Sequence, residues 1–467
     1  MNRVTVFLTV CYLSSPVTAS ELHLDEVLRT VRERFLPLRA SADDRDIAVA
    51  EEAASEGAFD PVLRARVGAI PYGYYQQLRL EAWVEQPTPF WGLTATAGYR
   101  LGLGKFAVYD GKLVTNAGGE IYGRLDLPLL RNGQTDARRT AIRRTRLGRK
   151  SAIVMYRREE LTHLHAAAVR WVDWVASGQR LATQAALLEV VRARDVAWRR
   201  RVTVGDLPAI DAVETGRAVV VRQTAVVVAA RVLQQASLEL GLYLGDRQAT
   251  PAQNRLPAQL SLPTMNVLGA EESIVLALAR RPEPERLRLA QQQSELDLAL
   301  HKNQRLPALN LYGGVSYDVG RAPADPELGR SLQGPVVEAG LFLDIPIPNR
   351  AARSRVVAAE AALRKTGRQL DFSRERVTVD VADALSALAA ARERLVLASL
   401  EEKLTRELEL GERKKLDAGE STLFLVNLRE QSTAEAAVRV IDATADTYKA
   451  WLGYLAAIGQ TVTDPPP

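Results

Sequence analysis

The chain has 467 residues, 47% of them hydrophobic and 25% charged, and its formal net charge is +5. This composition excludes an intrinsically disordered chain, and the length exceeds that of one ordinary domain. The small positive charge does not by itself imply a nucleic-acid partner.

Residues 1–19 have the pattern of a secretory signal peptide. Arg3 precedes an apolar run at residues 4–13, and Val17-Thr18-Ala19 offers the small residues that signal peptidase requires. A membrane anchor is the alternative, but ten apolar residues are far fewer than the roughly 20 that span a bilayer. We therefore predict cleavage after Ala19.

The one cysteine, Cys11, lies inside this segment. The mature chain therefore has no thiol for a disulfide or a thiolate metal site. Residues 8–11 (Leu-Thr-Val-Cys) also resemble the lipidation box of bacterial lipoproteins, so a lipid at Cys11 stays open as an alternative.

Residues 60–128 and 306–346 alternate between apolar and polar side chains, which predicts β-strands with one apolar face. The apolar positions include Leu78, Leu80, Ala82, Val84, Leu93, Ala95, Ala97, Tyr99, Leu101, Leu309, Leu311, Gly313, Val315, Tyr317, Val337, Ala339, Leu341 and Leu343. The same period fits a barrel wall in lipid or a half-buried soluble sheet. Aromatic residues typical of the girdles of a membrane barrel favour the barrel: Tyr72, Tyr74, Tyr75, Trp83, Trp91, Tyr99, Tyr109 and Tyr122.

Two long helices follow the strands. No strong helix breaker occurs between Pro128 and Gly205, or between Pro348 and Gly419. Each run of about 70 residues is roughly 105 Å of helix, so it needs a coiled-coil partner. The helix after each glycine has a heptad stripe. The stripes are Val226, Ala230, Leu233, Ser237, Leu240 and Leu244, and then Val440, Thr444, Thr447, Trp451, Tyr454 and Ile458.

No stretch after the signal peptide has the pattern of a transmembrane helix. The most apolar run, residues 218–236, is interrupted by Arg222 and Arg231, and a charge near a bilayer centre costs about 2.5–3.5 kcal/mol. If the chain enters a membrane, it must do so as β-strands.

The chain is an internal duplication with an offset of 214 to 246 residues. We divide it into a signal peptide (1–19), a first repeat (20–245), a linker (246–269), a second repeat (270–459) and a disordered tail (460–467). Each repeat has a helix, strands, a long helix (133–202 or 350–416) and a return helix (206–245 or 420–459). The first long helix is expected to be four residues longer than the second, measured between the matched proline and glycine.

These features together resemble the TolC-like outer-membrane efflux protein family, over residues 21–459. The local motifs are Pro-Leu-Leu-Arg-Asn-Gly at 128–133, its counterpart at 346–350, and the turn glycine followed by a helix that ends in Leu-x-x-x-Leu-Gly at 240–245. The resemblance implies an α+β membrane protein with long α-helical hairpins. It also implies a homotrimer in which each chain gives four strands to a 12-stranded β-barrel.

The strand regions of the two halves differ in length. The first has 67 residues between Pro61 and Pro128, and the second has 39 between Pro307 and Pro346. The 28 extra residues hold another hairpin-like pair, which either lengthens the strands or forms an external loop.

In this family the helix turns dock the periplasmic adaptor protein and form the gate. The resemblance therefore assigns docking to eight turn residues: Val204, Gly205, Asp206, Leu207, Leu416, Asp417, Gly419 and Glu420. Asp211 matches a family acid that keeps the tip closed, and Glu214 lies one turn further on. Family members often carry lumen acids where this chain has Leu425 and Leu428, so Asp211 and Glu214 are the candidates for an acidic ring. An ordinary hairpin turn and a solvated helix face are the alternatives.

Basic residues crowd the start of both long helices. Arg138, Arg139, Arg143, Arg350 and Arg353 are candidates for a basic cluster in the lumen, which would attract anionic solutes. A solvated surface or contact with anionic lipid is the alternative.

The resemblance predicts a passive exit duct in the outer membrane with a periplasmic extension. Its partners are further copies of itself, an adaptor, an inner-membrane transporter and outer-membrane lipid. An outer component of type I protein secretion and a periplasmic coiled-coil adaptor are the alternatives. We find no catalytic constellation, cofactor motif, metal site or nucleic-acid recognition module, so an enzyme or nucleic-acid binder is not expected.

Overall fold

The computed structural model describes residues 21–107, 114–245, 255–256, 259–321 and 334–464. The predicted signal peptide with Cys11, Tyr109, and much of the predicted linker lie outside these residues. The backbone divides into two compact units. The hairpin unit contains residues up to 39, 159–281 and 377 onward, and the strand unit contains 40–158 and 282–376.

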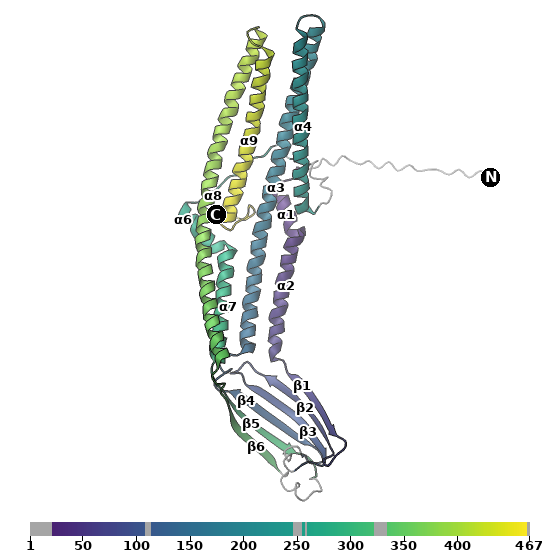
Figure 1. The fold of residues 1–467 in the computed structure, drawn as a ribbon, viewed down its shortest axis with the longest axis vertical. Helices are drawn as coiled ribbons and strands as arrows, with labels where there is room; N and C mark the ends of the chain where they lie inside the picture. The colour runs from purple at the N-terminus through teal and green to yellow at the C-terminus, as the bar shows by residue number, and fades with distance from the viewer. Residues whose placement is uncertain (1–20, 108–113, 246–254, 257–258, 322–333, 465–467) are drawn as a thin grey trace, which may run out of the picture. The chain divides into compact units, whose positions relative to one another are not determined.

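Each half begins with two consecutive helices, whereas the sequence predicts a single helix there (Figure 1). The pairs are α1 (Leu24–Arg34) with α2 (Leu36–Glu56), and α6 (Ala270–Arg280) with α7 (Pro282–Gln304). Phe35 and Arg281, the residues between the paired helices, have extended backbones. A proline lies in the first turn of each second helix, where its missing N–H leaves no helical hydrogen bond unmade.

The long helices are α3 (Ala137–Thr203) and α8 (Arg350–Asp417), with 67 and 68 residues. Their return helices are α4 (Ala209–Leu244) and α9 (Leu423–Ala457). The expected extra turn in the first long helix is therefore wrong. The additional residues lie in the connection between the strands and α3, which spans 129–136, whereas the equivalent connection before α8 spans 345–349.

The strand unit contains one antiparallel sheet of six strands, in the order of the chain. The strands are β1 (Val62–Ile70), β2 (Gln77–Pro87), β3 (Thr94–Gly104), β4 (Glu120–Pro128), β5 (Ala308–Asp318) and β6 (Pro335–Asp344), and a 3-10 turn, η1 (Gly57–Phe59), precedes them. The expectation of four strands per chain is wrong. The 28 extra residues of the first half form a second full hairpin that continues the same sheet.

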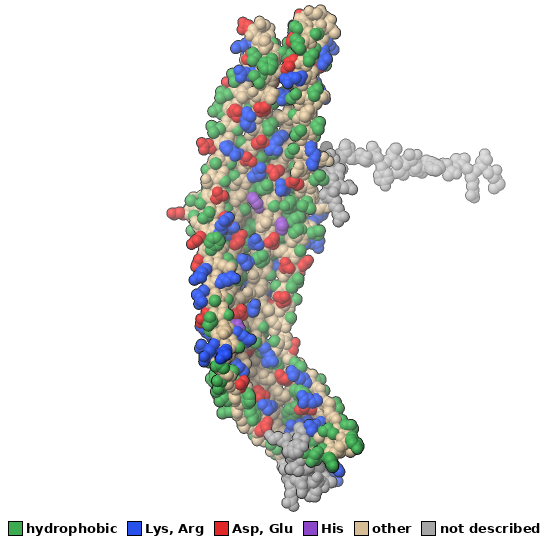
Figure 2. Space-filling view, in the orientation of Figure 1, with side chains coloured by type: hydrophobic (Ala, Val, Ile, Leu, Met, Phe, Trp, Pro, Cys, Tyr) green, Lys and Arg blue, Asp and Glu red, His purple; other side chains and the backbone are tan. Residues whose placement is uncertain are grey.

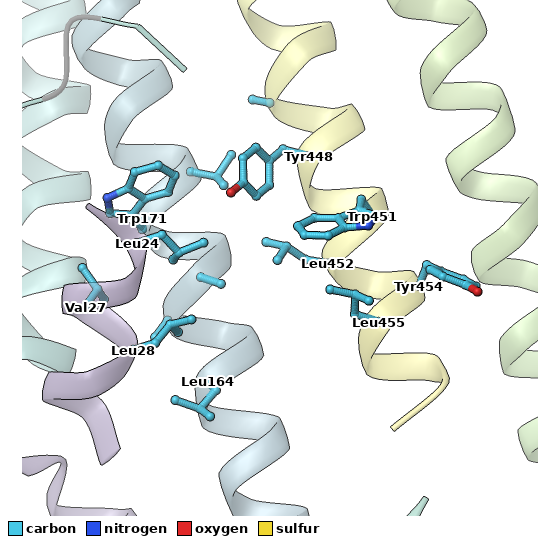
Figure 3. Close-up of a cluster of buried hydrophobic side chains, with 14 of the residues drawn as sticks. Leu24, Val27, Leu28, Leu164, Trp171, Tyr448, Trp451, Leu452, Tyr454 and Leu455 are labelled. Atoms are coloured by element: carbon cyan, nitrogen blue, oxygen red, sulfur yellow. The ribbon is translucent and has the colours of Figure 1, made fainter. Parts of the chain in front are cut away.

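The core of the hairpin unit lies where α1 packs against α3, α4 and α9 (Figure 3). Trp174 and Tyr454 are the largest side chains there with no exposed surface. Two polar side-chain groups in this core form hydrogen bonds to the backbone. Trp171 donates its indole N–H to the Leu22 carbonyl at 2.9 Å. The Tyr454 hydroxyl accepts from the Leu268 N–H at 3.1 Å. The core therefore ties the start of the chain to its last helix.

The predicted heptad stripes are buried mainly at the ends of the return helices that lie in this core. Ser237 and Leu240 of α4 are fully buried, as are Tyr454 and Ile458 of α9. Towards the tips the α4 stripe opens, and Ala230 is exposed.

The end of the chain differs from the predicted disordered tail. Gln460 and Thr461 are buried at 3% and 8% exposure, and the Thr461 N–H donates to the Asp464 carboxylate at 2.8 Å. The Gly459 backbone is left-handed, with φ of 75°, which turns these residues back onto the core. Residues 465–467 lie outside the described part of the chain.

Among the described residues, α4 is the one helix long and apolar enough to cross a membrane by length and composition. This differs from the expectation that no stretch has such a pattern. The same helix carries Arg222 and Arg231 within its apolar segment, and it packs against α1 and α9 in the core of the hairpin unit. We therefore describe α4 as a helix of that unit.

Candidate functional site: the hairpin tips and the two faces of the sheet

The two hairpin turns have the same backbone geometry. Gly205 and Gly419 have φ of 80° and 78°, a left-handed conformation that costs glycine little. The next residue in each turn donates its N–H to the carbonyl five residues earlier, Asp206 to Arg201 at 2.9 Å and Glu420 to Lys415 at 2.8 Å. This pairing satisfies carbonyls at the end of a helix and fixes the reversal of the chain.

A cleft of about 930 Å³ lies between the ends of the two hairpins. Among the predicted tip residues, Leu207, Leu416, Asp417 and Gly419 line it. Val204 is 79% exposed and is not part of the lining. The turns therefore present two kinds of surface, an exposed outer end and a recessed groove between the hairpins.

The candidate gate acids line the same cleft, together with Arg194 and Arg413. Glu214 forms an ion pair with Arg217 at 3.4 Å, within its own helix. Leu425 and Leu428 are 38% and 46% exposed. The candidate gate acids thus lie on the first hairpin, in α4, whereas Leu425 and Leu428 lie on the second, in α9.

A buried ion cluster joins the hairpins next to the cleft. Glu430 of α9 is 2% exposed, and it accepts hydrogen bonds from Arg194 of α3 and, at 2.8 Å, from Arg413 of α8. Arg194 also donates to the Asn427 side chain at 2.8 Å. One carboxylate therefore holds cations from both long helices, and a buried carboxylate requires such partners.

The sequence analysis missed Glu430, although the heptad stripe of α9 contains a signal for it. Steps of three and four residues back from Val440 lead to Ala437, Thr433, Glu430, Val426 and Leu423. A charge inside an otherwise uncharged stripe indicates a specific buried partner.

A second polar link closes the first hairpin. Asp195 of α3 accepts hydrogen bonds from Thr215 of α4 at 2.6 Å and from Arg199 at 2.7 Å. Burial alone would raise the pKa of Asp195, but these hydrogen bonds outweigh it and hold that pKa below its usual range.

The predicted basic cluster is not uniform. Arg139 forms an ion pair with Asp136 at 2.6 Å and donates to the Gly133 carbonyl, so it organises the connection into α3. The other four members, Arg138, Arg143, Arg350 and Arg353, are exposed and form no ion pair with another described residue. Figure 2 shows Lys and Arg side chains gathered over the start of α8.

The sheet separates its side chains completely by charge. The register places the even-numbered residues of β1, β3, β4, β5 and β6 on one face with the odd-numbered residues of β2. That face carries every charged residue of the six strands: Arg64, Arg66, Arg79, Glu81, Glu85, Arg100, Glu120, Arg124, Asp126, Asp318, Glu338 and Asp344. The other face of these six strands has no charge.

Several of these charges pair with one another. Arg64 of β1 binds Glu85 of β2 at 3.3 Å and Arg100 of β3 pairs with Glu120 of β4. Arg124 binds Asp126 within β4 at 2.9 Å. The charged face is therefore a network of partly exposed ion pairs, as suits a surface in contact with water.

The uncharged face is strongly apolar and exposed over much of its area. Leu63, Val67 and Val337 are 74%, 70% and 78% exposed, and Leu341 and Leu343 are also exposed. An exposed apolar surface of this extent marks a binding or membrane surface.

The predicted aromatic girdle is only partly placed on this face. Tyr99 lies on the uncharged face. Trp83 and Tyr122 lie on the charged face, because the register places both of them level with Gly98, the neighbour of Tyr99 in β3. Tyr72 and Tyr74, in the β1–β2 turn, are 90% and 95% exposed. Trp91 lies in the β2–β3 turn, at the other end of the strands.

Histidine is the commonest metal ligand in proteins, so the positions of the histidines bear on the prediction that the chain has no metal site. His163 lies 3.5 Å from Glu159 and against the Phe35 ring, whereas His165 contacts the backbone of Leu452. Among the described residues, no group of three or more His, Cys, Asp or Glu side chains is placed to hold a metal ion.

The fold is that of solved outer-membrane channels, although no protein-family model matches the sequence and no curated protein matches it. A membrane protein from Pseudomonas aeruginosa matches with a TM-score of 0.69 and 16% identity over 95% of this chain and 92% of that chain. The Campylobacter jejuni outer-membrane channel CmeC matches with a TM-score of 0.64 and 12% identity, over 99% of this chain and 95% of that chain. The open state of the Neisseria gonorrhoeae outer-membrane channel MtrE matches with a TM-score of 0.66 and 13% identity, over 94% of this chain and 90% of that chain.

The buried carboxylate can be tested by truncation. Glu430→Ala leaves the largely buried guanidinium of Arg194 without a carboxylate, whereas Arg413 keeps its ion pair with Glu409 at 2.6 Å. We expect a destabilisation of about 3 kcal/mol, the lower end of the range for a broken buried pair. Glu401→Ala is the matched control on the same hairpin. It removes an ion pair with Arg439 in which both side chains are about half exposed, and it should cost less than about 1 kcal/mol. Chemical unfolding of the purified protein, followed by circular dichroism, measures both; equal losses would contradict a special role for Glu430.

Proposed function

We propose that the chain is an outer-membrane channel of the TolC-like family and serves as the passive exit duct of a tripartite efflux pump. One observation carries the proposal: all charged residues of a six-stranded sheet lie on one face, and the opposite face is apolar. Strands of 9–11 residues have the length that crosses a bilayer when tilted. The likeness to solved channels over nearly the full chain supports the same conclusion.

The chemistry of the two faces gives each a role. The apolar face contacts lipid, and the charged face lines a water-filled lumen, because charged side chains on the lipid side of a barrel are destabilising. The hairpin unit extends the duct into the periplasm. The duct carries out no reaction, so the proposal needs no catalytic residue and no cofactor.

The family resemblance supports three copies per channel. Hairpin helices with exposed apolar side chains, such as Val227 and Val228 of α4 at 68% and 59% exposure, need neighbouring helices that one chain does not supply. Neighbouring copies in a trimer would provide them.

The tips are the proposed contact with the adaptor protein, through which an inner-membrane transporter energises export. Val204, Gly205, Asp206 and Glu420 form the exposed ends, and Leu207, Leu416, Asp417 and Gly419 form the groove. Asp211 and Glu214 are the proposed gate acids, because they face the cleft into which Arg194 and Arg413 also point.

The basic residues at the start of the long helices divide into two groups. Arg138, Arg143, Arg350 and Arg353 are proposed to attract anionic solutes if they face the lumen. Arg139 serves the local connection and is omitted from this role.

Two other functions are compatible with parts of the structure. The outer component of type I protein secretion would use the same fold and the same tips. A soluble periplasmic adaptor is less consistent with the structure, because its strands would place the exposed apolar face of Leu63, Val337 and Leu341 in water.

Cell fractionation and electrical recording test the channel function. The full-length chain, expressed in a Gram-negative bacterium, should appear in the outer membrane and, after purification, conduct ions across a planar lipid bilayer. Val315→Asp places a charge at the middle of the apolar face and should reduce the amount in the outer membrane strongly, because a charge there is destabilising. Ser316→Asp, on the charged face, is the matched control and should leave assembly intact. A soluble periplasmic monomer would contradict the channel.

Photo-crosslinking tests the adaptor contact in the bacterium that encodes the chain. A photoreactive amino acid at Val204 should form an adduct with a periplasmic coiled-coil protein, identified by mass spectrometry. The same probe at Val396, which is 68% exposed on the shaft of α8, should give no such adduct. Equal adducts at both positions, or none at Val204, would contradict docking at the tips.

A further inference from the structure

The sheet ends in two strands that each have one free edge. β1 is bonded to β2 and β6 is bonded to β5, so neither has a strand on its other side within the described residues. β1 and β6 have nine and ten residues, the length of a transmembrane strand. In lipid, unpaired backbone groups along such an edge would each cost several kcal/mol. Both edges therefore need a partner strand.

The β1–β2 hairpin belongs to the membrane wall rather than to an external loop. Leu63 and Val67 of β1 share the uncharged face with Val84 and Leu80 of β2. The apolar face thus continues without interruption from β3 to the β1 edge. A loop outside the membrane would not need this alternation.

We propose that β1 of each chain pairs with β6 of the neighbouring copy, so that three copies close one barrel of 18 strands. The number of copies rests on the proposed function, whereas the number of strands per copy comes from this chain's own sheet. Six strands of alternating direction place β1 and β6 antiparallel at each junction, as in the rest of the sheet. A head-to-tail contact of this kind forms a closed ring when its rotation closes.

The charges of the two edges are complementary. On the charged face, β1 carries Arg64 and Arg66 and no acid, whereas β6 carries Glu338 and Asp344 and no base. Opposite charges on neighbouring strands stabilise antiparallel pairing. No such match would arise if two β1 edges, or two β6 edges, faced each other.

The register within the sheet also fits closure. The hydrogen-bonded row that starts at Val62 of β1 reaches β6 at Glu338. That residue lies six positions before Asp344, the last residue of the strand. Level strand ends therefore need a stagger of about six residues per copy, or about 18 for three copies. A barrel with equal strand number and shear has a strand tilt of about 36°, within the range of membrane barrels.

This stagger predicts the residues that meet at the junction. Glu338 would lie opposite Gly68 of the neighbouring copy, which places Arg66 and Arg64 of that copy diagonal to Glu338 and Asp344. On the lipid face, Leu343 would lie opposite Leu63 of the neighbouring copy.

The strand number determines the width of the pore. With strands about 4.8 Å apart and tilted by about 36°, 18 strands give a barrel about 34 Å across between backbones, whereas 12 give about 23 Å. Natural barrels of 16–18 strands enclose an aqueous channel. The membrane part of the duct would accordingly be wide.

Cysteine crosslinking across the junction tests the proposal in the full-length protein. Leu63→Cys with Leu343→Cys, and Ala65→Cys with Leu343→Cys for a stagger two residues longer, place thiols on facing edge strands. The chain's one cysteine, Cys11, lies in the predicted signal peptide. Oxidation of outer-membrane fractions should give a ladder of covalent species that ends at three copies for at least one of the two variants. Leu80→Cys with Leu101→Cys, which face each other within one chain, is the control and should give no ladder.

Each other outcome overturns the proposal. A ladder that ends at two copies indicates 12 strands from a dimer. No ladder from either variant, in a protein that still forms a conducting trimer in the outer membrane, places β1 outside the wall and leaves the proposed function intact. A protein that is absent from the outer membrane without any substitution would instead remove the proposed function itself.

Discussion

The separation of charge across the six-stranded sheet is the constraint on which the rest of the structure depends. A sheet with an uncharged, apolar face and a face of Arg–carboxylate pairs needs an apolar environment on one side and water on the other, and in the proposed channel lipid covers the apolar side. Strands with period two make this separation possible, because neighbouring residues point to opposite faces. In the proposed barrel the open edges at β1 and β6 pair with further copies of the chain, so membrane insertion and assembly become parts of the same requirement.

The helices meet a different requirement in the hairpin unit. Helices of 67 and 68 residues cannot be stable as isolated elements, and their stability comes from packing. The α1–α3–α4–α9 core supplies this near Trp174 and Tyr454. Near the tips apolar burial declines, and polar links take over: Glu430 holds Arg194 and Arg413, and Asp195 holds Thr215. Such links are directional and depend on partner geometry, which suits the region that contains the proposed gate acids.

Local patterns predicted much of this architecture from the sequence. Alternation located the strands, proline and glycine bounded the long helices, and Gly205 and Gly419 marked turns whose left-handed backbone the structure contains. The number of strands was wrong because alternation does not decide which of residues 60–128 pair with one another, and pairing is a long-range property. The break at Phe35 was missed although Pro37 was a signal for it, since proline breaks a helix and favours an extended backbone just before it. Glu430 was missed because its burial depends on cations contributed by α3 and α8, far away in the sequence.

The environment of the two sheet faces tests this account most directly. Spin labels at Leu101 and Val315, on the uncharged face, can be compared with labels at Thr96 and Ser316 on the same two strands and the charged face. In purified protein reconstituted into lipid vesicles, the first pair should collide with oxygen dissolved in the bilayer and be shielded from a water-soluble nickel complex. The second pair should show the reverse. Nickel access to Leu101 and Val315 equal to that at Thr96 and Ser316 would contradict a lipid-facing sheet, and with it the assignment of the chain as a membrane channel.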